Sequence, residues 1–245
     1  YNSLSTNTTG ANNTALGYES LVANTTADNN TAVGYNTLLV NTTGTSNVAV
    51  GALALDANTT ASNNTAIGRG ALTVNTTGTQ NVAVGTNTLD ANSTASNNTG
   101  LGFNALGDNS TGSENTAIGS NALDANTTAA NNTAVGYSSL GANTTGTGNV
   151  AIGRLAGAAN TTAGSNTFVG ERAGLANTTG DESVAVGQFS YSSNTTGVDN
   201  VAVGRSALAA NTTAANNVAI GRAALTVNTT GASNTAVGAY SLDAN

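Results

Sequence analysis

The chain has 245 residues, of which 7% are charged and 4% aromatic, and it contains no proline, cysteine, methionine, tryptophan or histidine. Its five basic residues are all arginines, and its formal net charge is −7. Without a cluster of basic side chains the chain cannot neutralise many phosphates, so we expect no nucleic-acid binding. No apolar run approaches the roughly 20 residues of a membrane span, so we expect no membrane insertion.

The sequence repeats every 17 residues. Glycine recurs at residues 17, 34, 51 and so on up to 238, which gives fourteen complete copies without insertion or deletion and a partial copy of seven residues. Repeat positions are numbered 1 to 17, as in the first copy. Position 7 is always Asn, position 9 always Thr and position 17 always Gly, whereas positions 1, 2, 3, 5, 11 and 12 vary. A strict period without insertions predicts units that stack in one dimension.

Within one copy, a Leu at position 4 and an Asn-Thr-Thr triplet at positions 7–9 come first. Asn, Thr and Gly at this density disfavour a helix and favour turns. Positions 13–16, with sequences such as NVAV (47–50) and NTAI (64–67), indicate a short strand that ends at a glycine with positive φ. We therefore predict an all-β fold, a parallel β-solenoid or β-roll with one 17-residue coil per repeat.

Equivalent residues of successive coils should form ladders, in which Asn side-chain amides bond along the stack. The ladder residues of the first coils are Asn7, Asn24, Asn41, Asn58, Asn75, Thr9, Thr26, Thr43, Gly17, Gly34 and Gly51. At about 4.8 Å per coil, residues 1–245 are expected to form a single rod about 70 Å long. Because both ends stop inside ordinary repeats, we expect this rod to be a segment of a longer fibre.

The expected core is thin. Each coil offers one Leu at position 4 and one Val, Ile or Leu at position 16, beside Ala and the methyl groups of Thr. So few large apolar side chains offset little of the backbone entropy that is lost on folding. Burial of a further face between copies would add to stability, so we expect a homo-oligomer and favour a trimer. End-to-end self-association into a filament is the alternative.

Catalysis and metal binding are not indicated. The chain has no His, Cys or Lys, which excludes most pairs of nucleophile and base. Asp181 and Glu182 are adjacent, but neighbouring residues of a strand point to opposite faces, which places them poorly as an acid–base couple. No copy contains the glycine- and aspartate-rich repeat of calcium-binding β-rolls. We predict no enzymatic activity, no metal site and no cofactor.

The Asn-Thr-Thr triplet has three interpretations. In a secretory context it is an N-glycosylation sequon, with Asn24, Asn41 and Asn58 as candidate acceptors. If its side chains point outward, they form a regular array that suits binding to ice or another ordered surface. If they point inward, the triplet is a turn and ladder element that stacking holds constant, which is the interpretation we favour. Further sequons begin at Asn12, Asn29, Asn63, Asn97 and Asn131.

Residues 154–199 hold most departures from the repeat, among them Gly157, Gly174, Phe168 and Tyr191. Aromatic and arginine side chains suit carbohydrate or protein ligands. On this basis the candidate partner contacts are Tyr18, Tyr35, Arg154, Arg172, Phe189 and Tyr191. The alternative, which we favour, is that Phe168 or Tyr191 fills the volume that the two glycines leave empty.

Units such as NTAVGYNTL (30–38), NTAIGSNAL (115–123) and NVAIGRLAG (149–157) resemble the short repeats of phage tail-fibre-like proteins and bacterial surface fibres. They are also similar to the heads of trimeric autotransporter adhesins, the YadA-like family, whose left-handed parallel β-rolls repeat an AIG…A unit. The adhesin unit is somewhat shorter, so the added Asn-Thr-Thr segment implies a wider coil or another handedness.

The resemblance implies a left-handed, trimeric, extracellular fibre on a cell or virion surface. Its function would be to space or present a tip that binds a carbohydrate or protein receptor. The alternatives are a subunit of a self-assembling filament and an ice- or surface-binding solenoid that uses the Asn-Thr-Thr ladder.

Overall fold

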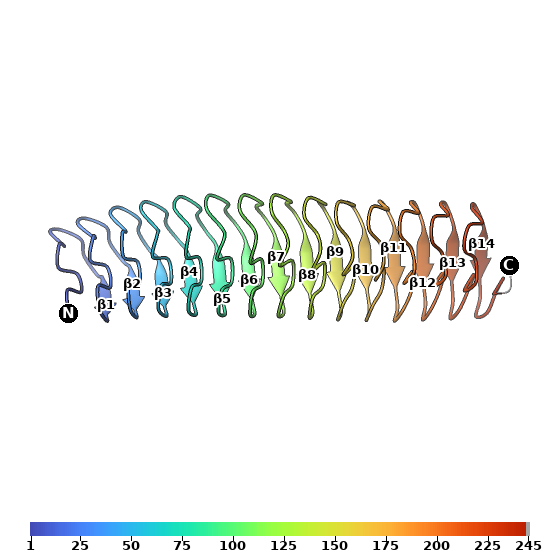
Figure 1. Ribbon diagram of the computed structural model, residues 1–245, viewed down its shortest axis with the longest axis horizontal. Helices are drawn as coiled ribbons and strands as arrows, with labels where there is room; N and C mark the ends of the chain where they lie inside the picture. The colour runs from blue at the N-terminus through green and yellow to red at the C-terminus, as the bar shows by residue number, and fades with distance from the viewer. Residues whose placement is uncertain (244–245) are drawn as a thin grey trace. The chain divides into compact units, whose positions relative to one another are not determined.

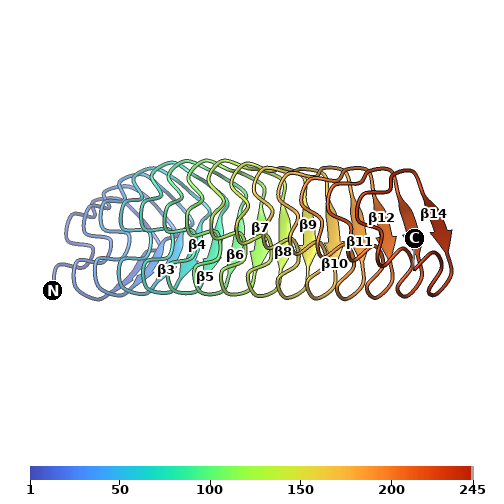
Figure 2. The same cartoon turned by 45° about the vertical axis from the view of Figure 1, so that its right-hand side comes forward.

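A computed structural model describes residues 1–243 and shows an all-β fold, with three-residue parallel strands and no helix among those residues. The chain falls into two compact units, residues 1–121 with 126–128 and residues 122–125 with those from 129 onward. Within each unit every coil takes 17 residues and carries one strand on the same side (Figure 2). The predicted parallel β-solenoid is confirmed, while the single rod over residues 1–245 stays a prediction.

The first unit holds seven strands, which follow one another in chain order (Figure 1). They are β1 (Thr14–Leu16), β2 (Thr31–Val33), β3 (Val48–Val50), β4 (Thr65–Ile67), β5 (Val82–Val84), β6 (Thr99–Leu101) and β7 (Thr116–Ile118). Neighbouring strands place equivalent repeat positions opposite each other, as where Ala49 of β3 pairs with Ala66 of β4.

The second unit repeats this arrangement. Its strands are β8 (Thr133–Val135), β9 (Val150–Ile152), β10 (Thr167–Val169), β11 (Val184–Val186), β12 (Val201–Val203), β13 (Val218–Ile220) and β14 (Thr235–Val237). The register does not slip at the irregular coils, since Phe168 of β10 lies opposite Ala151 of β9 and Ala185 of β11.

The glycine at position 17 ends each strand, as predicted. Gly51 has a φ of 130°, in the region that glycine alone adopts without strain. A Cβ atom at Gly51 would also lie 2.6 Å from the carbonyl carbon of Gly68 in the next coil. The backbone nitrogen of Gly51 donates to the carbonyl oxygen of Val33 at 2.8 Å, which continues the bonding between coils beyond the strand.

Two columns of buried Asn side chains hold successive coils together. Asn58, at position 7, donates from Nδ2 to Oδ1 of Asn41 in the preceding coil (2.9 Å) and to the carbonyl oxygen of Ala61 in its own coil (3.0 Å). Asn47, at position 13 of the preceding coil, donates from Nδ2 to the same carbonyl oxygen of Ala61 at 2.9 Å. The Asn ladder that the repeat predicts is therefore present, and both columns meet at the carbonyl of position 10.

Position 10 is restricted to Gly or Ala because its side chain lies between coils. A Cβ atom at Gly44 would lie 2.2 Å from the carbonyl oxygen of Ala61 and 2.5 Å from Oδ1 of Asn41. The geometry at Gly44 thus leaves no room even for a methyl group unless the coils shift. This crowding accounts for the absence of any residue larger than Ala at this position in the fourteen copies.

The core differs from the predicted one. Leu55 at position 4 and Ala66 at position 15 are fully buried, but Ile67 at position 16 is 40% exposed. The expected burial of position 16 is wrong because a three-residue strand turns only its middle residue inward. Position 3, which varies among Ala, Ser and Thr, supplies a buried column that the sequence analysis missed, as at Thr37 and Ala54.

Replacing Asn58 by Ala removes the hydrogen bonds that Asn58 donates to Asn41 and Ala61. Each of the two acceptor oxygen atoms then loses one donor in a buried site. We expect Asn58→Ala to lower the free energy of unfolding by roughly 2–4 kcal/mol, measured as a shift in the urea midpoint. The matched control is Thr60→Ala on the same turn, where the side chain is exposed and the change should stay within about 0.5 kcal/mol. Equal losses for the two variants would contradict a structural role for the Asn column.

Candidate functional site

The outward-facing repeat positions form rows along each unit, and these rows are the candidate surfaces. Within residues 1–243 the structure shows no pocket and no group of three or more carboxylates that could hold a metal ion. No helix in that part of the chain is long and apolar enough to cross a membrane. Asp181, one of the two adjacent carboxylates, accepts a hydrogen bond on Oδ1 from the backbone nitrogen of Gly164 at 2.7 Å.

Threonines at position 9, named here the threonine row, are exposed in all fourteen copies. At Thr9, Thr26 and Thr43, predicted as ladder residues, no side chain of the described coils bonds to the hydroxyl. The coils bond there through the backbone, as where the nitrogen of Thr43 donates to the carbonyl oxygen of Thr59 at 3.3 Å. Position 8 behaves differently: Oγ1 of Thr59 donates to the carbonyl oxygen of Thr76 at 3.3 Å. Stacking thus explains the hydroxyl at position 8, whereas no bond in the fold explains the constant Thr at position 9.

The structure argues against glycosylation at position 7. Asn24, Asn41 and Asn58 are fully buried. Nδ2 of Asn24 donates to Oδ1 of Asn7 (2.9 Å) and to the carbonyl oxygen of Ala27 (3.1 Å), so the fold has no room for a glycan on that atom. The sequons that begin at position 12 are different, because their asparagines are exposed.

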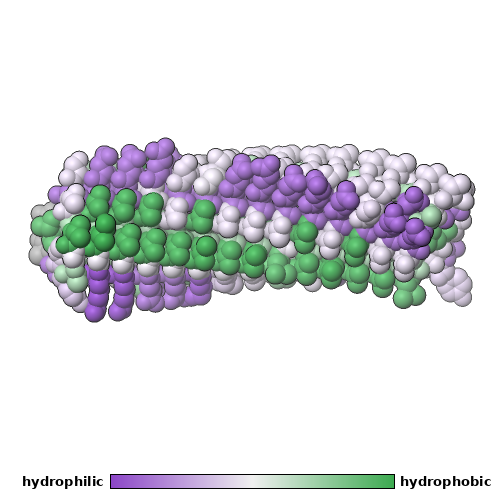
Figure 3. Space-filling model, turned by 180° about the vertical axis from the view of Figure 1, so that it is seen from behind, coloured by the Kyte–Doolittle hydropathy of each residue, from purple (hydrophilic) through white to green (hydrophobic). Residues whose placement is uncertain are grey.

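The outer side of each row of strands is an uncharged surface, named here the sheet face. It consists of the side chains at positions 14 and 16, and all 28 of these residues are Thr, Val, Ile or Leu. None of them is buried, and Leu101 and Ile220 are 45% and 40% exposed. Figure 3 shows the apolar side chains as a stripe over the strands.

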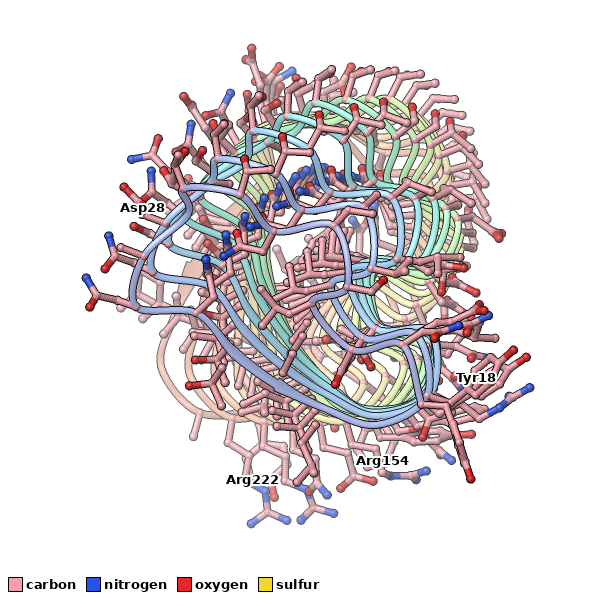
Figure 4. All side chains as sticks on the ribbon, turned by 90° about the vertical axis from the view of Figure 1, so that its left-hand side faces the viewer. Tyr18, Asp28, Arg154 and Arg222 are labelled. Carbon is pink, nitrogen blue, oxygen red and sulfur yellow. The ribbon has the colours of Figure 1, made fainter. Side chains whose placement is uncertain are left out.

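A basic edge borders the sheet face of the second unit on the side of positions 1 and 2. Its charged residues are Arg154, Glu171, Arg172, Arg205 and Arg222. Nη2 of Arg154 lies 3.1 Å from Oε1 of Glu171, and Gln188 donates from Nε2 to Oε2 of Glu171 at 2.9 Å. The hydrogen bonds from Gln188 and Arg154 lower the pKa of Glu171. Arg154 and Arg222 project away from the coil (Figure 4).

An acidic edge borders the same sheet face on the side of positions 11 and 12. It consists of Asp181, Glu182 and Asp199, all exposed. In the left part of Figure 3, which holds the C-terminal coils, hydrophilic side chains lie on both sides of the apolar stripe. The sheet face of the second unit is therefore uncharged along its centre and oppositely charged along its two sides.

Aromatic residues outside the core pair with neighbours one coil away. The rings of Tyr18 and Tyr35 stack with centroids 5.4 Å apart and planes 13° apart, and both side chains are about half exposed. A hydrogen bond with Glu19 raises the pKa of Tyr18. In the second unit, the guanidinium of Arg172 lies 5.6 Å from the ring centroid of Phe189. Within the first unit, Tyr18 and Asp28 lie at different corners of the coil (Figure 4).

Tyr191 is not a surface contact, in contrast to the prediction, because its side chain is fully buried. Its hydroxyl donates to the carbonyl oxygen of Gly197 at 2.8 Å and accepts from Nδ2 of Asn200 at 2.7 Å. Ser183 replaces the larger Asn at position 13 and lies 3.5 Å from this hydroxyl, which leaves room for the ring. Burial raises the pKa of Tyr191 to about 12.

Phe168 fills the space that two missing leucines leave. Cβ atoms at Gly157 and Gly174 would lie 2.7 Å and 2.6 Å from ring carbons of Phe168. The ring therefore occupies the place of the Leu side chains found at position 4 of the regular coils. This outcome confirms the interpretation of the irregular coils as compensation.

The sequence analysis missed the sheet face and its two charged edges. The signal for the face was the alternation of positions 14, 15 and 16, where only the middle residue is small. The signal for the basic edge was that every arginine of the chain occupies position 1 or 2. Both patterns can be assigned to surfaces of the fold once the strand is known to be three residues long.

Comparison of the chain with protein-family models, with curated proteins and with solved structures found no match. The resemblance to tail-fibre and YadA-like repeats therefore stays a prediction, as do the handedness of the coil and the number of copies.

Replacing Phe168 by Ala should open a cavity between Gly157 and Gly174 and lower the free energy of unfolding by about 3–5 kcal/mol. Adding Gly157→Leu and Gly174→Leu restores the side chains of a regular coil, so the triple variant should recover most of that loss in urea unfolding. The two leucines without the Phe168 change are the control, because overpacking should cost about 1–3 kcal/mol. A triple variant no more stable than Phe168→Ala would contradict the proposed compensation.

Proposed function

We propose that this chain is a structural element of an extracellular fibre, a rod of stacked coils that spaces or presents another part on a cell or virion surface. The observation that carries the proposal is the unbroken register of each unit. The same backbone pairs, the same Asn bonds and the same glycine turn recur in coil after coil without an inserted loop. In repeat proteins, insertions are where binding loops usually arise.

The pattern of variation supports a structural role. Buried positions 7 and 10 accept one or two residue types, because each side chain there contacts the equivalent residue of the next coil. Exposed positions 1 and 12 differ from copy to copy. The residues at positions 7 and 10 that this pattern keeps constant hold the stack together, and they do not form a surface cluster. Attachment to a carbohydrate or protein receptor would use the exposed pair of Tyr18 with Tyr35 and the half-buried pair of Arg172 with Phe189.

The fibre proposal also includes assembly from copies of the chain side by side, with three copies as the favoured number. The support is the composition of the core, in which each regular coil buries one Leu, three small residues and two Asn side chains. The Val and Ile side chains that would normally add apolar burial lie on the outside instead.

The length of the particle tests the fibre proposal. Deleting residues 59–92 removes two whole coils and joins position 7 to position 8. The particle should shorten by about 10 Å in small-angle X-ray scattering and keep its β-type circular dichroism. Deleting residues 59–88 is the control, because it breaks the register and should disrupt folding. A particle whose longest dimension does not change after the two-coil deletion would contradict a rod that acts as a spacer.

Binding to ice or to another ordered surface is a second candidate, which the threonine row favours. The row is exposed in every copy and its hydroxyls are free of side-chain bonds within the described coils. If this candidate is correct, the purified protein should shape growing ice crystals and show thermal hysteresis. Thr94→Tyr should then reduce the hysteresis several-fold, whereas Thr86→Tyr, at a position where other copies carry Tyr, should not. Ice growth unaffected by the unaltered protein would dismiss this function.

A further inference from the structure

We infer that the sheet face of the second unit is covered by a neighbouring copy of this chain, parallel and in register, with the basic edge of each copy against the acidic edge of the next. The inference rests on the proposed side-by-side fibre and adds to it the surface, the orientation and the register.

The first observation is the chemistry of the sheet face. Seven neighbouring strands, β8 to β14, present only Thr, Val and Ile to the outside, and no charge interrupts them. Removing such a surface from water requires no charged group to be desolvated. Soluble monomers rarely expose a continuous apolar patch of more than a few hundred Å². A second sheet face can pack on this one at the usual distance of about 10 Å between sheets.

The second observation is the charge of the two edges. The basic edge has four arginines and one glutamate, a net +3, and the acidic edge has three carboxylates, a net −3. Both edges lie within residues 154–222 of one unit, where the basic edge spans five coils and the acidic edge lies on two of those five. Complementary charges along an interface fix orientation and register more than they add affinity.

These charges select one orientation. Two copies related by a rotation about the stacking direction meet with opposite edges together, so that residues of the same coil face each other. Two antiparallel copies bring each edge against the same edge of the partner and move every coil to a different level. Only the parallel arrangement places Arg172 at the level of Asp181 and Glu182 of the next copy, with Arg205 one coil away from its Asp199. A cyclic assembly of two or of three copies has this property.

The area is sufficient for a stable contact. Seven strands at about 4.8 Å each and three residues long give about 340 Å² per copy for the strands of this unit. With the two edges, which lie six residues apart from position 12 to position 1 of the next coil, the face widens to about 20 Å and the area to about 700 Å². Stable protein interfaces bury about 800 Å² per partner. With its edges, the face is therefore close to the size that a lasting contact between copies needs. A transient ligand does not require so large a surface.

The first test measures mass by sedimentation equilibrium at micromolar concentration. The unaltered chain of 23.7 kDa should sediment as a dimer or trimer. Val203→Glu places a charge in the centre of the sheet face and should weaken association at least 100-fold. The matched control Thr196→Glu adds the same charge to the threonine row of the same coil and should leave the mass unchanged. A monomeric unaltered chain would overturn the inference but leave the rod itself intact.

The second test reverses the edges and does not depend on how Val203→Glu folds. A chain with Glu182→Arg and Asp199→Arg has two basic edges, and a chain with Arg205→Glu and Arg222→Glu has two acidic edges. Each alone should associate at least tenfold more weakly than the unaltered protein at low salt, and mixing the two should restore association. If each reversed chain associated with itself as strongly as with the other reversed chain, the edge-to-edge contact would be overturned.

The third test reads the register directly, using the absence of cysteine in the chain. Gln188→Cys and Asp199→Cys place thiols on opposite edges of the same coil. A mixture of the two single variants should form a disulfide between chains, and neither variant alone should do so. The parallel register would be overturned if either variant cross-linked to itself. It would also be overturned if the mixture did not cross-link although its mass stayed that of an oligomer. A chain that is not rod-shaped in scattering would instead refute the fibre proposal.

Discussion

The fold depends on one acceptor, the carbonyl oxygen of position 10, on which two columns of buried Asn side chains converge. At Ala61 this oxygen accepts from Asn58 of its own coil and from Asn47 of the coil before. Buried polar groups stabilise a fold only when they are fully bonded, and a network that extends from coil to coil meets this condition by repetition. Because an inserted residue would displace every partner in the network, the constraint also accounts for the strict 17-residue period.

The polar interior determines what the outside looks like. With Asn at two core positions and small residues at positions 3, 10 and 15, the interior has space for one Leu per coil. The strand is only three residues long, so its two outer residues, which are β-branched in most copies, point to solvent. The apolar surface that a globular domain would place in its core is therefore on the sheet face. The thin core and the exposed apolar stripe are two results of the same arrangement.

Much of the fold was predictable because repetition itself carries the information. The period, the parallel coils, the Asn ladder and the glycine turn follow from fourteen aligned copies in one chain. The direction of the Asn-Thr-Thr side chains was not predictable, because Asn and Thr suit both a buried ladder and an exposed turn. What decides it is the bond from Asn58 to a neighbouring coil, a contact 17 residues away. Local pattern likewise suggested a core role for Ile67, but strand length determines which face it occupies.

The stack also restricts the kind of partner that can cover it. A surface whose side chains recur about every 4.8 Å is matched over many coils only by a partner with the same spacing. A folded protein of another kind would match one or two coils and then lose register. Ice, a crystalline polymer and another copy of this chain can all keep a regular spacing, but of these only the copy carries both a basic and an acidic edge beside its sheet face. Although residues 1–243 form no pocket, a repetitive surface is therefore compatible with specific recognition when the partner is repetitive too.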